Sequence, residues 1–235
     1  MHYSFEPIGV IHSPFREKFG IPRQPLLVPE AKARLELLAP YARAEALTGL
    51  EDFSHLWITF VFHQAMRGKW QPMVRPPRLG GNQRMGVFAS RSPFRPNPIG
   101  LSVVGLEGIN VANGKAELNL YGVDLLDGTP VLDIKPYIPY VDSIPDAQAG
   151  YAAAPPDLCL EVAFSAQAEG QLSGRSDGAE LKRLIVGLLQ MDPRPAYKKD
   201  AEPGRIYGMQ LYDFDLQWRV CGNVVEVLGL QQPEG

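Results

Sequence analysis

The sequence lacks the short motifs that mark several common enzyme classes. It contains no GxGxxG pattern and no GxxxxGKS/T pattern, so neither a Rossmann cofactor site nor a P-loop is indicated. It contains no GxSxG, and neither of its two cysteines has a marked histidine partner. Cys159 and Cys221 lie far apart without a CxxC motif, which favours idle thiols in a reducing cytoplasm over a disulfide.

A metal site and a membrane span are not expected either. His55 and His63 stand at the two ends of one predicted strand, roughly 26 Å apart at about 3.3 Å per residue, which is too far to share a metal ion. No window approaches eighteen consecutive apolar residues, and residues 1–15 lack the basic and apolar regions of a signal peptide. We therefore expect a cytoplasmic protein without a membrane segment.

Acidic residues are absent from one long stretch of the chain. Between Phe53 and Leu106 there is no Asp or Glu. The same stretch holds seven cations: Arg67, Lys69, Arg75, Arg78, Arg84, Arg91 and Arg95. The overall formal charge is −3, so the rest of the chain carries −10. These cations either form one positive face that attracts phosphates or are scattered over several loops, and we favour the single face because so long a stretch without an acid is unusual.

Proline, by contrast, is abundant at 22 residues, which favours strands, turns and loops over long helices. The first two thirds of the chain contain many short strand-like runs, separated by turn signals such as ANG and LDGTP. The run at 55–63 is continuous enough to be a fully buried strand, and the run at 158–165 is expected to close the sheet. One short helix is predicted at 43–50. The pattern is typical of an antiparallel barrel or sandwich.

The composition changes near Ser165, where a polar segment rich in glycine and serine begins. Beyond it, apolar residues at helical spacing predict a helix at about 178–192. Residues 206–220 alternate between apolar and polar, and a CGN turn then leads to a returning strand at 224–230. We therefore predict a mainly β protein, with an antiparallel β-barrel domain over 1–165 and a small α+β domain over 166–235.

Four polar clusters interrupt the β-rich region: IPRQP at 21–25, FHQAM at 62–66, RSPFRPNPIGLS at 91–102 and YGVDLLDGTPVLDIKPY at 121–137. In the third cluster three prolines fix the backbone around two arginines, which suits an anionic or polar ligand because binding then costs less ordering entropy. Each cluster taken singly is also explained as a loop or turn with solvated side chains. Together they supply cations, amides, an imidazole and carboxylates, as a zwitterionic small molecule requires.

Longer motifs make the sequence resemble a known family. GVFASRSPFRPNPIGLS, VRPPRLGGN, FSHLWITFVFHQ and DGTPVLDIKPY closely resemble the TsaA-like family, also called the TrmO family. The resemblance includes DPRPAY and YDFDLQWRV, so it runs essentially from end to end. It implies a homodimeric tRNA methyltransferase that uses S-adenosylmethionine on an N-terminal β-barrel unrelated to Rossmann-type methyltransferases. The implied reaction is methylation of N6 of threonylcarbamoyladenosine, immediately 3′ of the anticodon of threonine tRNA.

The resemblance also implies a set of cofactor-binding residues: Pro22, Arg23, Gln24, His63, Gln64, Arg91, Leu101, Tyr121, Gly122, Val123 and Asp124. An arginine can fork onto the carboxylate of S-adenosylmethionine, and Asp124 can accept from its ammonium or ribose. The sequence does not fix which arginine takes which group.

Catalytic and RNA-binding residues are predicted from residue type. The acceptor N–H is a poor nucleophile whose proton must leave, and Asp133 and Lys135 are candidates for assisting it, unless they form only a structural ion pair. Contacts with the tRNA, phosphate contacts by the basic stretch among them, are predicted at Arg75, Arg78, Arg95, Arg194, Tyr197, Lys198 and Lys199. The last four lie in DPRPAYKK, which is alternatively a simple helix-to-strand connection. A noncatalytic RNA-binding module and a small-molecule methyltransferase are the competing functions.

Overall fold

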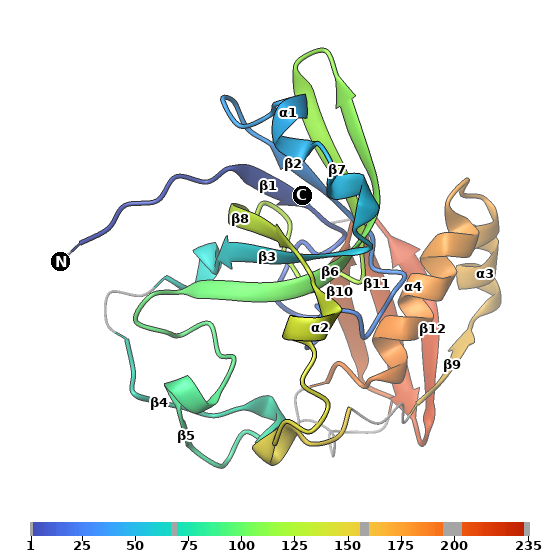
Figure 1. The fold of residues 1–235 in the computed structure, drawn as a ribbon. Helices are drawn as coiled ribbons and strands as arrows, with labels where there is room; N and C mark the ends of the chain where they lie inside the picture. The colour runs from blue at the N-terminus through green and yellow to red at the C-terminus, as the bar shows by residue number, and fades with distance from the viewer. Residues whose placement is uncertain (1, 67–69, 156–159, 195–203, 233–235) are drawn as a thin grey trace.

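The computed structural model describes residues 2–66, 70–155, 160–194 and 204–232. A closed six-stranded barrel forms the N-terminal part, and a four-stranded sheet with two helices forms the C-terminal part (Figure 1). The prediction of a mainly β protein with an N-terminal antiparallel barrel and a smaller α+β part is confirmed.

The barrel strands follow the order β1-β2-β7-β6-β3-β8, and every neighbouring pair is antiparallel. Their bounds are β1 Gly9–His12, β2 Ala33–Leu37, β3 His55–Val61, β6 Ile99–Ala112, β7 Lys115–Tyr121 and β8 Pro130–Pro136. Pairing of Gly9 with Val131 closes the ring. Side chains such as Leu35, Ile58 and Leu118 are fully buried and fill it.

The burial of β3 differs from the prediction of a fully buried strand. Only alternate residues of β3 are buried, Leu56, Ile58 and Phe60, whereas its other residues are partly exposed. The strand was expected to be buried on both faces, but a barrel strand has one face turned outward, so its bulky outward residues stay partly accessible. The strand also ends at Val61, and His63 lies in the short helix that follows it.

The remaining N-terminal elements are short and lie in loops. They are α1 Ala44–Leu47, η1 Leu50–Asp52, η2 His63–Ala65, β4 Met73–Val74, η3 Pro77–Leu79, β5 Met85–Gly86, η4 Val87–Ala89, α2 Pro139–Asp142 and η5 Gly150–Ala152. The predicted helix at 43–50 is confirmed by α1. Between β3 and β6 the chain makes a long excursion away from the barrel, in which β4 and β5 pair (Figure 1). We call residues 70–98 the basic lobe.

The C-terminal sheet has the order β10-β11-β12-β9. Its elements are β9 Glu161–Phe164, α3 Ala166–Ser173, α4 Gly178–Gln190, β10 Ile206–Leu211, β11 Phe214–Cys221 and β12 Val224–Gln231. The helix predicted at 178–192 is confirmed by α4, and the hairpin at the CGN turn by β11 and β12. The stretch 206–220 was predicted as one strand, but Tyr212 adopts a φ of 49° and turns the chain between β10 and β11.

The prediction that residues 158–165 close the first sheet is wrong. The barrel is already closed by β1 and β8, and β9 instead pairs in parallel with β12, with Val162 opposite Val225. We therefore propose that the C-terminal part includes β9 and so begins before residue 166.

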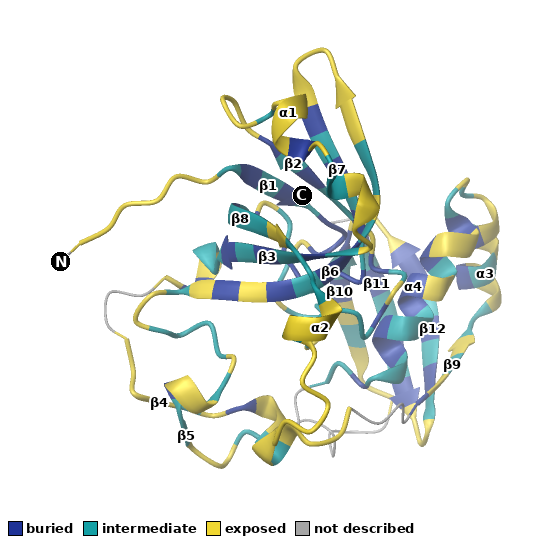
Figure 2. Cartoon of the chain, viewed as in Figure 1, coloured by how far each residue is buried: buried dark blue, intermediate teal, exposed yellow. Residues whose placement is uncertain are grey.

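One hydrophobic core runs through both parts. The buried face of α4 presents Leu181, Leu184, Ile185, Leu188 and Leu189 to it (Figure 2). Phe15, in the loop after β1, forms a bridge with Leu211 of β10, and Tyr212 N–H donates to the carbonyl of Pro14 over 2.9 Å. The loop that leads to residues 22–24 is therefore held between the barrel and the C-terminal sheet.

Candidate functional site

Several of the predicted site segments are joined by hydrogen bonds. The Arg91 guanidinium donates to the side-chain oxygen of Gln24, which links the third polar cluster to the first. Leu26 directly follows the first cluster, and its N–H donates to the carbonyl of Gly122 over 2.8 Å, which links that loop to the fourth cluster. Segments that lie far apart in the sequence thus meet at one place beside the barrel.

The second polar cluster joins the same place. Phe62 N–H donates to the carbonyl of Pro98 over 2.8 Å, so the end of β3 is held against the end of the basic lobe. The Lys18 ammonium donates to the carbonyl of Gln64 over 2.7 Å. His63 is half-buried and Gln64 is exposed. All four clusters singled out in the sequence are therefore connected.

Gly122 is needed for the contact between two of these segments. Its φ is +67°, and a Cβ atom there would lie 2.5 Å from Cδ2 of Leu26 and 3.1 Å from its Cα. Any side chain would combine an unfavourable backbone conformation with a clash against backbone. The absence of a side chain lets the two loops approach, with Pro22 buried in one and Val123 buried in the other.

Asp124 is a half-buried carboxyl next to this contact. The Ser102 hydroxyl donates to its Oδ1 over 2.7 Å. Burial raises the pKa of Asp124 to about 6, although the Ser102 hydrogen bond, a backbone hydrogen bond and the charge of Arg91 each lower that pKa. Such a carboxyl gains most from a bound cation or hydrogen-bond donor, because either compensates for its lost hydration.

The C-terminal part contributes a contact to the same place. Arg23 is exposed, and its Nη2 donates to the backbone carbonyl of Asp192 over 3.3 Å. The Asp192 carboxylate is buried and paired with Arg194, with oxygen–nitrogen distances of 2.8 and 3.0 Å. The Arg194 side chain is only 12% exposed, so the structure places it in this ion pair rather than on an open surface. Tyr197, Lys198 and Lys199 lie outside the described residues.

A long groove of about 2210 Å³ lies alongside these residues. The charged residues among its described lining are all cations: Lys18, Arg23, Arg75, Arg78, Arg84, Arg91 and Arg95. The expected single positive face is therefore found for the described cations of the acid-free stretch, whereas Arg67 and Lys69 lie outside the described residues. The groove exceeds the roughly 300–1,000 Å³ that small ligands occupy, which leaves room for part of a polymer.

Two predicted residues face elsewhere. Leu101 is 55% exposed on the outer face of β6, while the next residue, Ser102, is buried and contacts Asp124. Leu101 pairs with Thr59, which pairs in turn with Asp133, so these three form one row on the outside of the barrel. The Leu101 and Asp133 side chains are therefore not brought to Asp124 within one chain, since neighbouring strand residues point to opposite faces.

Lys135 and Tyr121 each contact a neighbouring side chain of the barrel. Lys135 forms an exposed ion pair with Asp133, two residues away on β8. The Tyr121 hydroxyl lies 3.5 Å from Nε2 of His55, at the end of β7. In the described part of the chain no group of three His, Cys, Asp or Glu side chains is placed to hold a metal ion.

The residues that sequence reasoning missed are Ser102, Leu26 and Asp192. Ser102 was marked only by being a lone polar residue in an apolar strand. Leu26 acts through its backbone, which leaves no signal in the sequence. Asp192 begins the DPRPAYKK segment, but nothing in that segment indicates that its backbone carbonyl accepts from Arg23.

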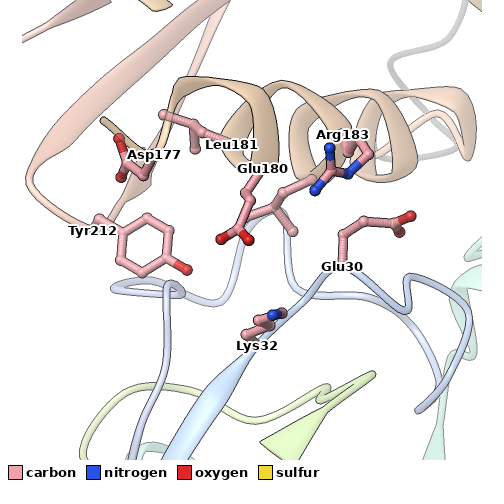
Figure 3. Close-up of a pocket in the computed structure, with 8 residues that line it drawn as sticks. Glu30, Lys32, Asp177, Glu180, Leu181, Arg183 and Tyr212 are labelled. Carbon is pink, nitrogen blue, oxygen red and sulfur yellow. The ribbon is translucent and has the colours of Figure 1, made fainter. Parts of the chain in front are cut away.

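A second pocket lies between α4 and β2 (Figure 3). It is lined by Glu30, Lys32, Asp177, Glu180 and Arg183, among others, so it contains both signs of charge. Its volume is about 70 Å³, which is room for a couple of water molecules at about 30 Å³ each. Lys32 is already paired with Glu107 at 3.0 Å. This pocket is too small for a nucleotide-sized ligand, and we assign it a structural role.

Comparison with known proteins covers nearly the whole chain. Residues 10–143 match the family model described as the tRNA-methyltransferase O N-terminal domain, and residues 157–233 match the TrmO C-terminal domain. The tRNA (adenine(37)-N6)-methyltransferase of Escherichia coli K12 is 53% identical over 230 residues, covering 97% of this chain and 98% of that protein.

Two further matches come from Pseudomonas aeruginosa. A putative S-adenosylmethionine-dependent methyltransferase of strain PAO1 is 52% identical over 219 residues, covering 93% of each chain. A crystal structure of TrmO from this organism superimposes with a TM-score of 0.81 at 46% identity, covering 98% of each chain. The barrel and the C-terminal part thus occur together in a solved structure.

Proposed function

This chain belongs to the tRNA-methyltransferase O (TrmO) family, and we propose that it transfers a methyl group from S-adenosylmethionine to N6 of adenine 37 in tRNA. The single observation that carries the proposal is the meeting of four loop segments, through the Arg91–Gln24, Leu26–Gly122 and Phe62–Pro98 hydrogen bonds, beside a groove whose charged lining is cationic. We propose further that the adenine carries a threonylcarbamoyl group and that the tRNA is specific for threonine.

The residues at the meeting point fit S-adenosylmethionine. Its carboxylate, ammonium and sulfonium require an arginine and a carboxylate close together, and Arg91 acts electrostatically on Asp124 across this site. Arg23 and Gln24 would hold the amino-acid end with Arg91, and the backbone of residues 121–124 and the His63–Gln64 turn would bind the ribose and adenine. When bound, the cofactor supplies an electrophilic methyl group for in-line displacement.

The chain's own contribution to that displacement is positioning and proton removal. In-line transfer requires the acceptor nitrogen to be held close and aligned, which the rigid proline-braced loops favour. The acceptor N–H must also lose a proton. We propose that Asp133 accepts it, since its carboxylate lies on an accessible face of β8, where it is paired with Lys135.

We also propose that the active unit is a homodimer in the cytoplasm. Leu101 and Asp133 share the outer face of the barrel, whereas Asp124 lies on the other face of β6. If a second copy packs against this outer row, Leu101 and Asp133 of one copy can lie beside Asp124 of the other. The two copies together would then complete one site. Among the described residues, no helix combines the length and the apolar character needed to cross a bilayer.

Two experiments separate this proposal from its competitors. Thermal unfolding with S-adenosylmethionine at about 100 times its dissociation constant should show roughly 2.7 kcal/mol of stabilisation, which a noncatalytic RNA-binding module would not show. Nucleoside mass spectrometry of tRNA from a deletion strain should show loss of one methyl group from threonylcarbamoyladenosine. Retention of that methyl group in the deletion strain, at a level that reintroducing the gene does not change, would contradict the proposed substrate.

A further inference from the structure

Two large aromatic side chains of the basic lobe are exposed and stacked on each other. Trp70 is 50% exposed and Phe88 is 72% exposed. Their ring centroids are 6.4 Å apart, and the ring planes meet at 30°. Both line the cationic groove. Exposed apolar side chains that gather in one patch mark interaction sites, so this pair is a candidate contact surface.

An arginine is fixed against the same pair. The Arg95 guanidinium lies 5.7 Å from the centroid of Phe88. One of its nitrogens donates to the carbonyls of Val87 and Ser90, over 3.1 and 2.7 Å. Because these bonds anchor the guanidinium, the ring of Phe88 is held in place in spite of its exposure. The result is a preorganised flat apolar surface among positive charges.

We propose that Trp70 and Phe88 form a stacking platform for an unpaired base of the anticodon loop of the substrate RNA. This inference rests on the proposed function, because it takes the substrate to be a tRNA. Every nucleobase has a π face that stacks on aromatic side chains, and the neighbouring phosphates match the cations of the groove. A platform here holds the loop open beside the adenine that is methylated.

Charge complementarity favours RNA over a second copy of the chain. In a twofold-symmetric dimer the same surface lies on both subunits, so a contact centred on the groove would bring Arg75, Arg78 and Arg84 of both copies together. Such a contact would be repelled by like charges. An RNA backbone presents the opposite charge and, in a loop, free bases at the same place.

The first test measures binding of a synthetic RNA hairpin with the anticodon stem-loop sequence of threonine tRNA. Trp70→Ala and Phe88→Ala should each raise its dissociation constant roughly tenfold, as expected for loss of one stacked base. Trp70→Phe should bind nearly as wild type. The slope of log affinity against log salt should stay unchanged, because no phosphate contact is lost. Tyr140→Ala, which removes an aromatic that is 86% exposed outside the groove, is the matched control.

The second test is a double-mutant cycle between protein and RNA. Abasic substitutions at each loop position should include one that weakens binding to wild type but not to Trp70→Ala. Additive losses at every position, or wild-type binding by both alanine variants, would overturn the platform. A shift of the variants from dimer to monomer in sedimentation would assign the surface to a second copy instead.

The same experiments distinguish the platform from the proposed function. If the wild-type protein methylates tRNA and the platform variants bind the hairpin normally, only the platform is wrong. If the wild type shows neither methyl transfer to tRNA nor hairpin binding, both proposals fail. Thermal unfolding of each variant should match wild type, which shows that lost binding is not lost folding.

Discussion

Nη2 of Arg23 donates a hydrogen bond to the backbone carbonyl oxygen of Asp192, and these two atoms are 3.3 Å apart. The contact joins the loop after β1 to a residue two positions after the C-terminal end of α4. Asp192 adopts a φ of +49° and is held by its pair with Arg194. The C-terminal part therefore orients an arginine of the proposed cofactor site.

Replacing Arg194 should affect both stability and cofactor binding. In Arg194→Ala the buried Asp192 carboxylate loses this cation, at a cost of about 3 kcal/mol in the free energy of unfolding. Affinity for S-adenosylmethionine should also fall, because Arg23 loses its fixed acceptor. Chemical denaturation and calorimetric titration measure the two effects. Arg219→Ala, which removes an exposed ion pair with Glu226, is the control and should change neither by much.

Arg91→Ala should weaken S-adenosylmethionine binding without unfolding the chain. Arg91 is exposed, and its bond to Gln24 lies between loops rather than in the core. Loss of a charge-assisted pair with the cofactor carboxylate should cost roughly tenfold or more in the dissociation constant. Arg84→Ala, at another exposed arginine of the groove, should leave that constant unchanged. Equal affinities for the Arg91 variant and wild type in calorimetry would remove Arg91 from the cofactor site.

Cofactor affinity should depend on pH through Asp124. The pKa of this carboxyl is raised to about 6, so it is largely protonated in the free protein below that pH. A bound cation favours the ionised form and must displace the proton, so affinity should rise with pH up to about 6 and then level off. Asp124→Asn should bind more weakly at neutral pH and lose this dependence. Titrations across pH 4.5–8 in matched buffers check the profile.

The contribution of Asp124 to folding stability should fall with rising pH, whereas cofactor affinity should rise. A carboxyl whose pKa is higher in the folded state holds its proton longer there, so stability falls as the pH rises from the ordinary value of 3.8 to about 6. Asp124→Asn lacks this loss and should gain stability relative to wild type across that interval. Urea denaturation at several pH values measures the difference, and a difference that does not change with pH would contradict the raised pKa.

Gly122→Ala should destabilise the chain more than Gly128→Ala. Both glycines have positive φ, +67° and +75°, so the conformational cost of alanine, about 1 kcal/mol or more, is shared. Only at Gly122 would the new Cβ meet Leu26, whereas nothing lies within 4 Å at Gly128. The additional loss of unfolding free energy at Gly122 therefore reports how closely the loops of residues 26 and 122 approach. Cofactor affinity should fall in the Gly122 variant alone. Equal losses of stability would argue against the close approach.

Reversing charge at Arg75 and Arg78 should weaken tRNA binding and flatten its salt dependence. Each phosphate contact contributes close to one unit to the slope of log affinity against log salt. The slope of the double variant should therefore be smaller in magnitude by up to about two units. Lys115→Glu, at the exposed tip of the β6–β7 hairpin on the far side of the barrel from the basic lobe, is a charge-reversal control on another face (Figure 1). Filter binding over a salt series gives both quantities, and wild-type behaviour of the double variant would place the RNA on another face.

The sequence predicts local features of this molecule better than its long-range pairings. Turn residues and alternation indicate the barrel strands and α4, because these signals lie within a few neighbouring residues. The pairing of β9 with β12 depends on residues at 161–164 and 224–227, so no local pattern distinguishes it from barrel closure. Likewise Arg91 and Asp124 were recognisable as members of two polar clusters and from the family motifs, but their relation through Ser102, Gln24 and Gly122 required the fold.

The parallel pairing of β9 with β12 also has a consequence for synthesis of the chain. During translation β9 leaves the ribosome first and must wait for residues 165–223 before its partner strand exists. Until then its edge is unpaired, and the helices α3 and α4 have no complete sheet to cover. The barrel, whose strands all precede it, can close earlier. Ribosome-stalled chains that end near residue 200 should therefore carry a protease-resistant barrel followed by a protease-sensitive tail, and should depend on chaperones until β12 emerges.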